Sequence, residues 1–425
     1  MVCGFSLTLL KLYYMKKMKR CVLLLMSVAA LAGACNNETS EETLGYQPSA
    51  EPIAFDVVAA DALTRATGEI ASTEALKASD LGFGVFACYT GNLQYEYTSV
   101  QPDFMYNQQV KWATSASAWT YEPVKYWPNQ ASDYVTFFAY APYEVAPDGL
   151  KCIAEFSKAD DLGDPWLIYK LAQDPWSATN GQVDLLYGIN EGTSEDASDD
   201  QPWYDQQKSG YDSSSKLTFT FKHALACIGD VIQIRIAEEL SALLDAGAYA
   251  KLYIEKVEIN YTNLTSKARL ILNSRGQPNW RAIVSGDVTV SRTISIPQSE
   301  VPEAFRAADD NLTAAAYQAY YEAEAHVGLT TASQDLLTGK GLFYIPLNVA
   351  GEQLYSITLH YQIINNAGQA FAGSVTSGNN TLDITTNAIG KKSGINMVLT
   401  KDLDLEHNVY VIGSAATEPS YARKH

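Results

Sequence analysis

Hydrophobic and polar residues alternate with a period of two along much of the chain, which is the spacing of a β-strand with one buried face. Ile53, Phe55 and Val57 share one face of a strand predicted over residues 52–60. The same alternation predicts further strands, bounded by Gly, Asn, Asp or Ser clusters, at residues 217–222, 231–236, 250–261 and 355–363. Many short strands separated by turn residues predict an all-β protein built from antiparallel β-sandwiches.

One segment departs from this pattern. Residues 311–325 are rich in Ala and Glu and begin with Asn311, a residue that favours the N-cap position of a helix. We therefore expect a small helical insertion in an otherwise β domain.

The length of the chain and one polar stretch indicate two domains. A chain of 425 residues exceeds the size at which one hydrophobic core usually stops growing. Residues 190–215 form a long predicted loop, and a domain boundary is expected just after it, near residues 222–228. We predict an amino-terminal sandwich over residues 66–222 and a carboxyl-terminal one over residues 223–425.

The same loop carries a strong excess of negative charge. Lys208 is its one basic residue, opposed by seven acidic residues: Glu191, Glu195, Asp196, Asp199, Asp200, Asp205 and Asp212. Calcium binding is one interpretation, but the regular ligand spacing of a known calcium loop is missing. A solvated loop is the preferred interpretation, and we expect no metal site.

The first 35 residues have the layout of an export signal. Lys16, Lys17, Lys19 and Arg20 form a basic cluster, an apolar run follows over residues 21–32, and small residues lead to Cys35. This is the layout of a secretory signal peptide, and the run is shorter than the ~20 residues that a transmembrane helix needs. We predict a signal peptide over residues 15–34, with translation starting at Met15 because residues 1–14 place an apolar stretch before the positive charge.

Cys35 is the predicted site of lipidation. The segment Leu31-Ala-Gly-Ala-Cys35 resembles a bacterial lipobox, in which the cysteine carries the lipid and becomes the new amino terminus. Ordinary cleavage without lipidation is the alternative. The polar, acidic residues after Cys35 cannot fold alone and are expected to form a tether at the cell surface, as in some gram-negative lipoproteins.

The negative charge of the chain excludes two kinds of partner. Residues 1–34 hold five basic and no acidic residues, so the chain from Cys35 onward carries 25 basic and 48 acidic residues, a net charge of −23. Such a surface repels nucleic acid and anionic membranes, and neither is an expected partner.

No catalytic or metal-binding motif stands out. Cys88, Cys152 and Cys227 are the cysteines of the predicted folded part, and their spacing matches neither a disulfide framework nor a zinc site. The histidines are not paired at metal-ligand spacing, and there is no HExxH, GxSxG, P-loop or GxGxxG after a strand. We therefore expect no enzyme activity and no cofactor, although glycosidase carboxylates can lie far apart in sequence.

Three segments together resemble the fimbrillin family, the pilins of certain gut and oral gram-negative bacteria. They are Trp119-Thr-Tyr-Glu-Pro-Val-Lys-Tyr-Trp127-Pro128, Val135-Thr-Phe-Phe-Ala-Tyr-Ala-Pro142-Tyr and Leu217-Thr-Phe-Thr-Phe-Lys-His223-Ala-Leu-Ala. The resemblance spans most of residues 50–412. Core packing is the simplest physical role for these tryptophans and for His223.

This resemblance implies two transthyretin-like β-sandwich domains and assembly by strand exchange. In the family, a lipoprotein precursor reaches the outer membrane, and a trypsin-like protease cuts it after an arginine. Loss of the amino-terminal strand opens an apolar groove that a terminal strand of the next subunit fills. The implied partners are other pilin subunits, the outer membrane through the lipid anchor, and a host glycan or protein ligand.

Two places in this sequence match that mechanism. Residues 61–68 form a small, polar linker that contains Arg65 and Ala66, the predicted cleavage site, so residues 35–65 would be a removable tether and strand. At the other end, Leu403, Leu405, Val409 and Val411 share one face of a predicted donor strand. An ordinary terminal strand in its own sheet is the alternative for this segment, and a surface glycan-binding lipoprotein is the alternative for the whole chain.

Overall fold

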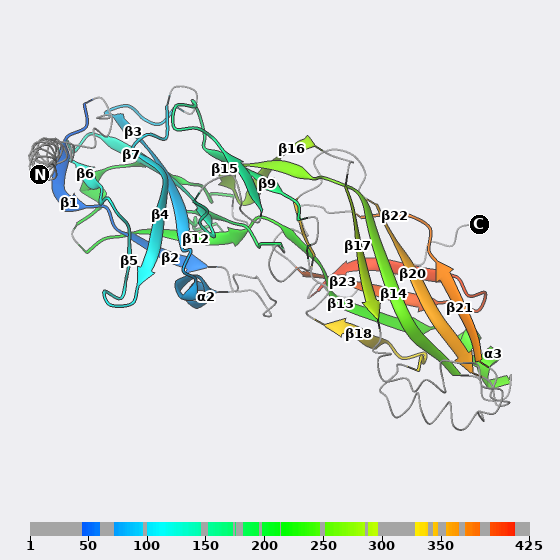
Figure 1. The fold of residues 1–425 in the computed structure, drawn as a ribbon. Helices are drawn as coiled ribbons and strands as arrows, with labels where there is room; N and C mark the ends of the chain where they lie inside the picture. Colours follow the sequence, from blue (N-terminus) through cyan, green and yellow to red (C-terminus); the bar gives the residue numbers. More distant parts are fainter. Residues whose placement is uncertain are drawn as a thin grey trace, which may run out of the picture. The chain divides into compact units, whose positions relative to one another are not determined.

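The computed structural model shows a mostly β protein (Figure 1). The residues that the structure describes are 45–59, 72–96, 100–145, 152–172, 175, 182–194, 198–212, 214–246, 251–284, 288–295, 328–338, 343–346, 354–364, 370–382 and 392–412. The prediction of an all-β sandwich-type fold is confirmed. The signal segment, Cys35, Arg65, Ala66 and the predicted helix at 311–325 lie outside the described residues.

Among the described residues, the largest sheet has eight strands and contains the predicted amino-terminal strand at its edge. Its order is β2-β12-β10-β7-β3-β4-β5, with β11 pairing β7. The bounds are β2 Phe55–Ala59, β3 Phe83–Gly91, β4 Met105–Ala113, β5 Ala118–Thr120, β7 Tyr134–Ala141, β10 Leu186–Ile189, β11 Trp203–Gln206 and β12 Leu217–His223. A further, two-stranded sheet is formed by β1 Pro48–Pro52 and β6 Tyr126–Pro128.

A four-stranded sheet joins segments from both sides of the predicted domain boundary. Its order is β16-β15-β9-β8. The bounds are β8 Ile153–Phe156, β9 Trp166–Lys170, β15 Lys267–Arg275 and β16 Gln277–Val284. The antiparallel pairing of β9 with β15 brings a segment of the second predicted domain onto a strand of the first. Residues 47–425 group into a single compact unit, and the predicted boundary remains a prediction.

Two five-stranded sheets pack face to face in the carboxyl-terminal half. One has the order β18-β13-β23-β24 with β19 on β13, and the other has the order β17-β14-β20-β21 with β22 on β20. The bounds are β13 Ala226–Ile236, β14 Lys251–Leu264, β17 Val288–Ser295, β18 Gln334–Thr338, β19 Phe343–Ile345, β20 Leu354–Ile364, β21 Ala370–Thr376, β22 Asn380–Thr381, β23 Lys392–Leu399 and β24 Leu405–Val411. The ring of Tyr261 on β14 packs against that of Phe343 on β19 with centroids 5.0 Å apart, so the buried faces of the two sheets meet as a sandwich.

Two short α-helices were not predicted from the pattern. Helix α2, Thr73–Ala78, begins at the N-cap Ser72, whose hydroxyl accepts a hydrogen bond from the backbone N–H of Ala75. Helix α3, Glu238–Ala246, buries Leu240, while Glu238 and Glu239 are exposed in its first turn. A 3₁₀ turn, η1, covers Lys208–Gly210. None of the described helices has the length and hydrophobicity needed to cross a membrane.

The aromatic motifs of the sequence pack in the core. Trp127 is buried and stacks on Tyr211 with ring centroids 4.6 Å apart, and it meets Phe137 edge-on at 5.9 Å. The Nδ1 atom of His223 lies 2.8 Å from a carboxylate oxygen of the buried Asp184. These contacts confirm the interpretation of Trp127 and His223 as packing residues.

The three cysteines of the described part, Cys88, Cys152 and Cys227, are buried and form no disulfide, in line with the absence of a disulfide framework in the sequence. Burial raises the pKa of the Cys152 thiol to about 11, so this side chain is protonated at neutral pH. A protonated, buried thiol is a poor nucleophile and metal ligand, which fits a packing role.

Candidate functional site: two edge strands

Strand β2 occupies one edge of the eight-stranded sheet. Alternate side chains of β2 and of the residues just before it point into the hydrophobic core. Ile53, Phe55 and Val57 are 1%, 1% and 4% exposed, whereas Val58, on the opposite face, is 49% exposed. The predicted alternation of this strand is therefore confirmed. Burial of three such side chains contributes roughly 5–9 kcal/mol in total.

Phe55 lies at the centre of an aromatic cluster. Its ring centroid is 5.4 Å from that of Tyr121, 5.9 Å from those of Phe137 and Phe219, and 6.3 Å from that of Phe83. These four rings come from separate segments of the chain. Removal of β2 would therefore leave an apolar groove lined by aromatic side chains, with the backbone edge of β12 unpaired.

The pairing of β2 is parallel to β12, over the five register pairs from Phe55 with Leu217 to Ala59 with Phe221. Strand β1, which precedes it, pairs antiparallel with β6. The backbone N–H of Ala59 donates to the hydroxyl of Thr73, so the end of β2 is tied to the first turn of α2. Residues 47–59 are therefore held to the fold by strand pairing in two sheets and by buried side chains. The sequence did not predict the pairing of β1.

A change at Phe55 tests the contribution of β2 to stability. Phe55→Ala is expected to lower the free energy of unfolding by about 3–5 kcal/mol, because it removes a fully buried ring and leaves a cavity. Val58→Ala, on the exposed face of the same strand, is the matched control and should change stability by about 0.5 kcal/mol or less. Thermal melting of the two variants beside the wild type is the measurement. Equal shifts in melting temperature would contradict the packing role of Phe55.

The candidate donor strand occupies the edge of another sheet. Strand β24 pairs antiparallel with β23, and the register places Leu405 beside Leu399 and Val409 beside Ile395. Ile395 and Leu399 are fully buried, but within β24 only Leu405 is buried, and Val409 and Val411 are half-buried. Leu403 precedes the strand in the left-handed backbone region, with φ +61°, which is uncommon for a bulky residue.

His407 lies in the middle of β24 and contacts the opposite sheet. Its Nδ1 atom is 2.9 Å from the hydroxyl of Tyr355 on β20, and the two rings meet with centroids 4.8 Å apart. Its Nε2 atom lies 2.8 Å from the Asn380 side-chain nitrogen. Burial lowers the pKa of His407 to about 4, so the imidazole is neutral at pH 7. Strand β24 is therefore joined to both sheets of its sandwich.

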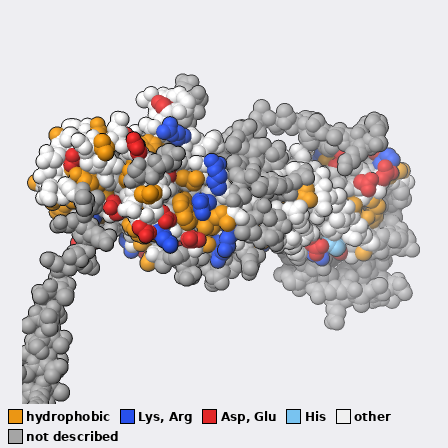
Figure 2. All heavy atoms as spheres, turned by 90° about the horizontal axis from the view of Figure 1, so that it is seen from above, with side chains coloured by type: hydrophobic (Ala, Val, Ile, Leu, Met, Phe, Trp, Pro, Cys, Tyr) orange, Lys and Arg blue, Asp and Glu red, His pale blue; other side chains and the backbone are white. Residues whose placement is uncertain are grey.

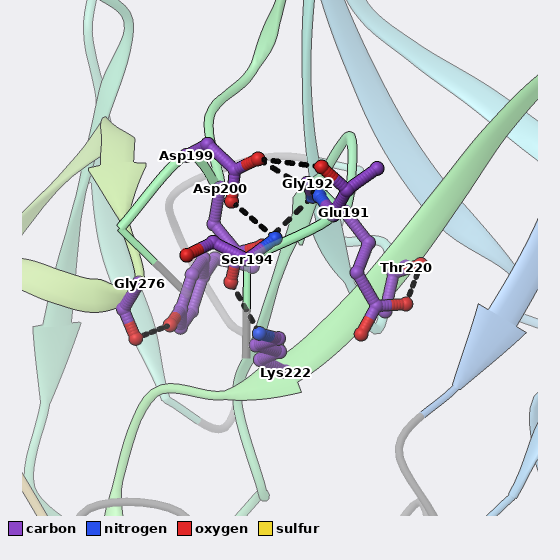
Figure 3. A network of polar contacts seen from close by, with 10 residues as sticks. Glu191, Gly192, Ser194, Asp199, Asp200, Thr220, Lys222 and Gly276 are labelled. Atoms are coloured by element: carbon purple, nitrogen blue, oxygen red, sulfur yellow. Dashed lines mark hydrogen bonds and ion pairs between the residues drawn. The ribbon is translucent and has the colours of Figure 1, made fainter. Parts of the chain in front are cut away.

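The acidic loop is partly built into the fold (Figure 3). Asp199 accepts hydrogen bonds from the backbone N–H groups of Thr193 and Ser194, at 2.8 and 3.0 Å, and these bonds lower the pKa of its carboxyl. A Cβ atom at position 192 would come within 2.2 Å of the Asp199 carboxylate, so a larger residue there would have to displace this carboxylate. The loop thus folds around one of its own carboxylates.

Asp200 corrects the interpretation of this loop as simply solvated. It is 2% exposed, accepts a hydrogen bond from the Gly192 N–H, and forms an ion pair with Lys222 of β12. Strand β11 and η1 also fall inside the segment predicted as a loop. Within the described part of the chain, no three His, Cys, Asp or Glu side chains are grouped to hold a metal ion.

The molecular surface carries both signs of charge despite the net charge of −18. On the face drawn in Figure 2, basic side chains gather among acidic and hydrophobic ones. Where the side chains are coloured, this face is not uniformly acidic.

The fold and its two edge strands define an all-β protein of sandwich type. The chain belongs to the fimbrillin-like family, whose model matches residues 64–409. This confirms the family resemblance seen in the sequence.

Three individual proteins similar to this chain are described as fimbrial. Over 129 residues the chain is 35% identical to fimbrium subunit Fim1C of Phocaeicola vulgatus, a match that covers 30% of this chain and 31% of that protein. A fimbrial protein from Bacteroides vulgatus has a similar fold, with a TM-score of 0.57 at 20% identity over 85% of this chain and 99% of that one. The fimbrial anchor protein Mfa2 from Porphyromonas gingivalis is more distant, with a TM-score of 0.33 at 9% identity over 85% of this chain and 97% of that one.

Proposed function

We propose that the chain is a structural subunit of a surface pilus that polymerises by strand exchange and supports cell adhesion. The observation that best supports this proposal is the position of β2. It is an edge strand that fills an aromatic groove, and it is followed along the chain by the segment that contains Arg65. The proposed role is structural, with no catalytic step.

In this proposal, export precedes assembly. The signal over residues 15–34 directs secretion, and Cys35 carries a lipid that holds the precursor at the outer membrane. An arginine-specific protease then cuts between Arg65 and Ala66. The lipid anchor and β2 lie on the same side of this cut, so cleavage separates the subunit from both.

The difference in burial between the two edge strands favours exchange. The apolar side chains of β24 are mostly half-buried in their own sheet, whereas those on the inner face of β2 are almost completely buried in the groove. A β24 strand that enters the vacated groove of a neighbouring subunit would therefore gain buried apolar area. Full burial of four such side chains is worth ~6–12 kcal/mol. Because these side chains are already partly buried in their own sheet, the net gain on insertion is only a fraction of that value, before the cost of ordering the strand.

The amino terminus of the surface form tests this proposal. Surface-exposed protein that has assembled into polymers is expected to begin at Ala66, and membrane-bound precursor at a lipidated Cys35. Amino-terminal sequencing of the polymers and intact mass spectrometry of both fractions are the measurements. Polymers that begin at Cys35 would contradict removal of the strand.

Cys35→Ser is the companion variant for the anchor. It should lose labelling by a fatty-acid analogue and fail to reach the surface, while the folded part remains intact. Persistent acyl labelling of this variant would refute Cys35 as the lipidation site.

A further inference from the structure

A polar pocket with a volume of about 470 Å³ lies where β11, β15 and the segment before β9 meet. None of the described residues that line it belongs to β2 or β24. Its size falls within the range of small-molecule sites. Two tyrosine rings and several hydrogen-bonding side chains line it, chiefly Tyr95, Tyr204, Asp164, Gln201, Asn273 and Arg275.

Asp164 is held in place by neighbours from two other segments. One of its carboxylate oxygens accepts a hydrogen bond from the Tyr95 hydroxyl at 2.8 Å, and the other accepts one from the Asn273 amide at 2.6 Å. Asn279 in turn donates to the Asn273 side-chain oxygen at 2.8 Å, which fixes the orientation of the amide. Each carboxylate oxygen can accept about two hydrogen bonds, so each retains capacity for a ligand hydroxyl.

The aromatic wall of the pocket is equally fixed. The Tyr95 and Tyr204 rings lie 5.4 Å apart, and both pack against the buried ring of Phe138, at 5.7 and 5.8 Å. The Asp205 carboxylate accepts a hydrogen bond from the Tyr95 backbone N–H at 2.6 Å. Asp205 itself has φ +54°, an uncommon backbone conformation that is found more often at functional sites than elsewhere.

The charges in the pocket restrict the class of ligand. The guanidinium of Arg275 lies 5.8 Å from the Tyr204 ring centroid and acts electrostatically on Asp164. The positive charge of Arg275 opposes a metal cation, and the carboxylates of Asp164 and Asp205 oppose an anion. The apolar surface available is that of two tyrosine rings, which suits a flat ligand with polar edges better than an apolar peptide.

We propose that this pocket binds one sugar residue of a neutral glycan. Vicinal hydroxyls of the sugar would donate to the free lone pairs of Asp164 and accept from Arg275 and Gln201, while a C–H face of the ring would pack on Tyr204. The proposal goes beyond the pilus function, because a subunit can polymerise with or without this pocket.

The test uses the full folded chain. A glycan array with neutral and acidic glycans is followed by titration with methyl glycosides of galactose, glucose, mannose and N-acetylglucosamine. Asp164→Asn keeps the shape of the side chain but removes one acceptor oxygen and the charge, and it should weaken binding at least about tenfold. Arg275→Met, at an exposed position, should weaken binding similarly without affecting the fold. Asp80→Asn, an exposed aspartate away from the pocket lining, is the matched control and should bind as the wild type does.

Several results would overturn the proposal. They are an absence of glycan binding by the wild type, binding to acidic glycans alone, or unchanged binding in both pocket variants. Melting temperatures of all variants separate loss of a contact from loss of the fold. Polymer formation by Asp164→Asn should match that of the wild type, so failure of the sugar proposal leaves the pilus proposal independently testable.

Discussion

Arg65→Ala is expected to leave the precursor uncut on the membrane and to abolish pilus polymers. Arg65 is the one arginine in the sequence between Arg20 and Arg235, so this change removes the arginine site at which the anchor and β2 could be separated from the fold. The measurement is an immunoblot of membrane and surface fractions, read for precursor length and for laddered, heat-sensitive polymers.

Two further variants sharpen this result. Arg65→Lys should behave like Arg65→Ala if the protease is specific for arginine, and like the wild type if it also accepts lysine. Leu63→Ala keeps the arginine in the same linker and is the matched control, with normal processing expected. Normal polymers from Arg65→Ala would contradict the proposed cleavage site.

Cleavage alone is not expected to empty the groove. The cut breaks no contact of the buried Phe55 ring, and β2 stays paired with β12 over five register pairs. The cut fragment should therefore copurify with isolated subunits and leave only when a donor strand replaces it. If the cut fragment is lost at the same time as polymers form, donor-strand insertion and release of β2 are linked.

Removal of the chain after Asp402 is expected to abolish polymers, because it deletes β24 together with Leu403. Electron microscopy and heat-sensitive ladders on gels measure the polymer, and circular dichroism measures the fold of the monomer. Because β24 also covers the edge of β23, loss of folding would by itself explain a lack of polymers. A second variant that retains the strand is therefore needed.

A reversible crosslink supplies that variant. Two hydrogen bonds fix the pairing pattern of β23 with β24: Thr400 N–H donates to the Asp404 carbonyl, and Ile412 N–H donates to the Lys392 carbonyl. Hydrogen-bonded and non-hydrogen-bonded pairs alternate along an antiparallel ladder, so the next pair along from Lys392 and Ile412, Ser393 with Val411, is a non-hydrogen-bonded pair. Side chains of such pairs lie close enough for a disulfide. Ser393→Cys combined with Val411→Cys should block polymers when oxidised and permit them when reduced.

The two single cysteine variants are the controls and should polymerise under both conditions. Normal polymers from the oxidised double variant would show that β24 stays in its own sheet during assembly. The terminal strand would then be an ordinary edge strand, as the alternative interpretation holds.

The amino-acid sequence alone determined the fold class and the faces of many strands. Alternation at Ile53, Phe55 and Val57 sufficed because a strand with one buried face needs no knowledge of its partners. The same local rule identified residues 231–236, 250–261 and 355–363, which fall in or largely overlap β13, β14 and β20. The aromatic motifs identified the family before any contact was known.

Only the tertiary structure decided which strands lie together. The parallel pairing of β2 with β12 and the pairing of β9 with β15 join segments that are far apart in the chain. Hydrophobic periodicity shows which face of a strand is buried but not which strand it pairs with. The pocket was missed for the same reason, since Tyr95, Asp164 and Asn273 have no shared motif and meet only after folding. Asp200 looked solvated in sequence but is buried, because the Gly192 backbone and Lys222 compensate its charge through contacts that the sequence pattern does not reveal.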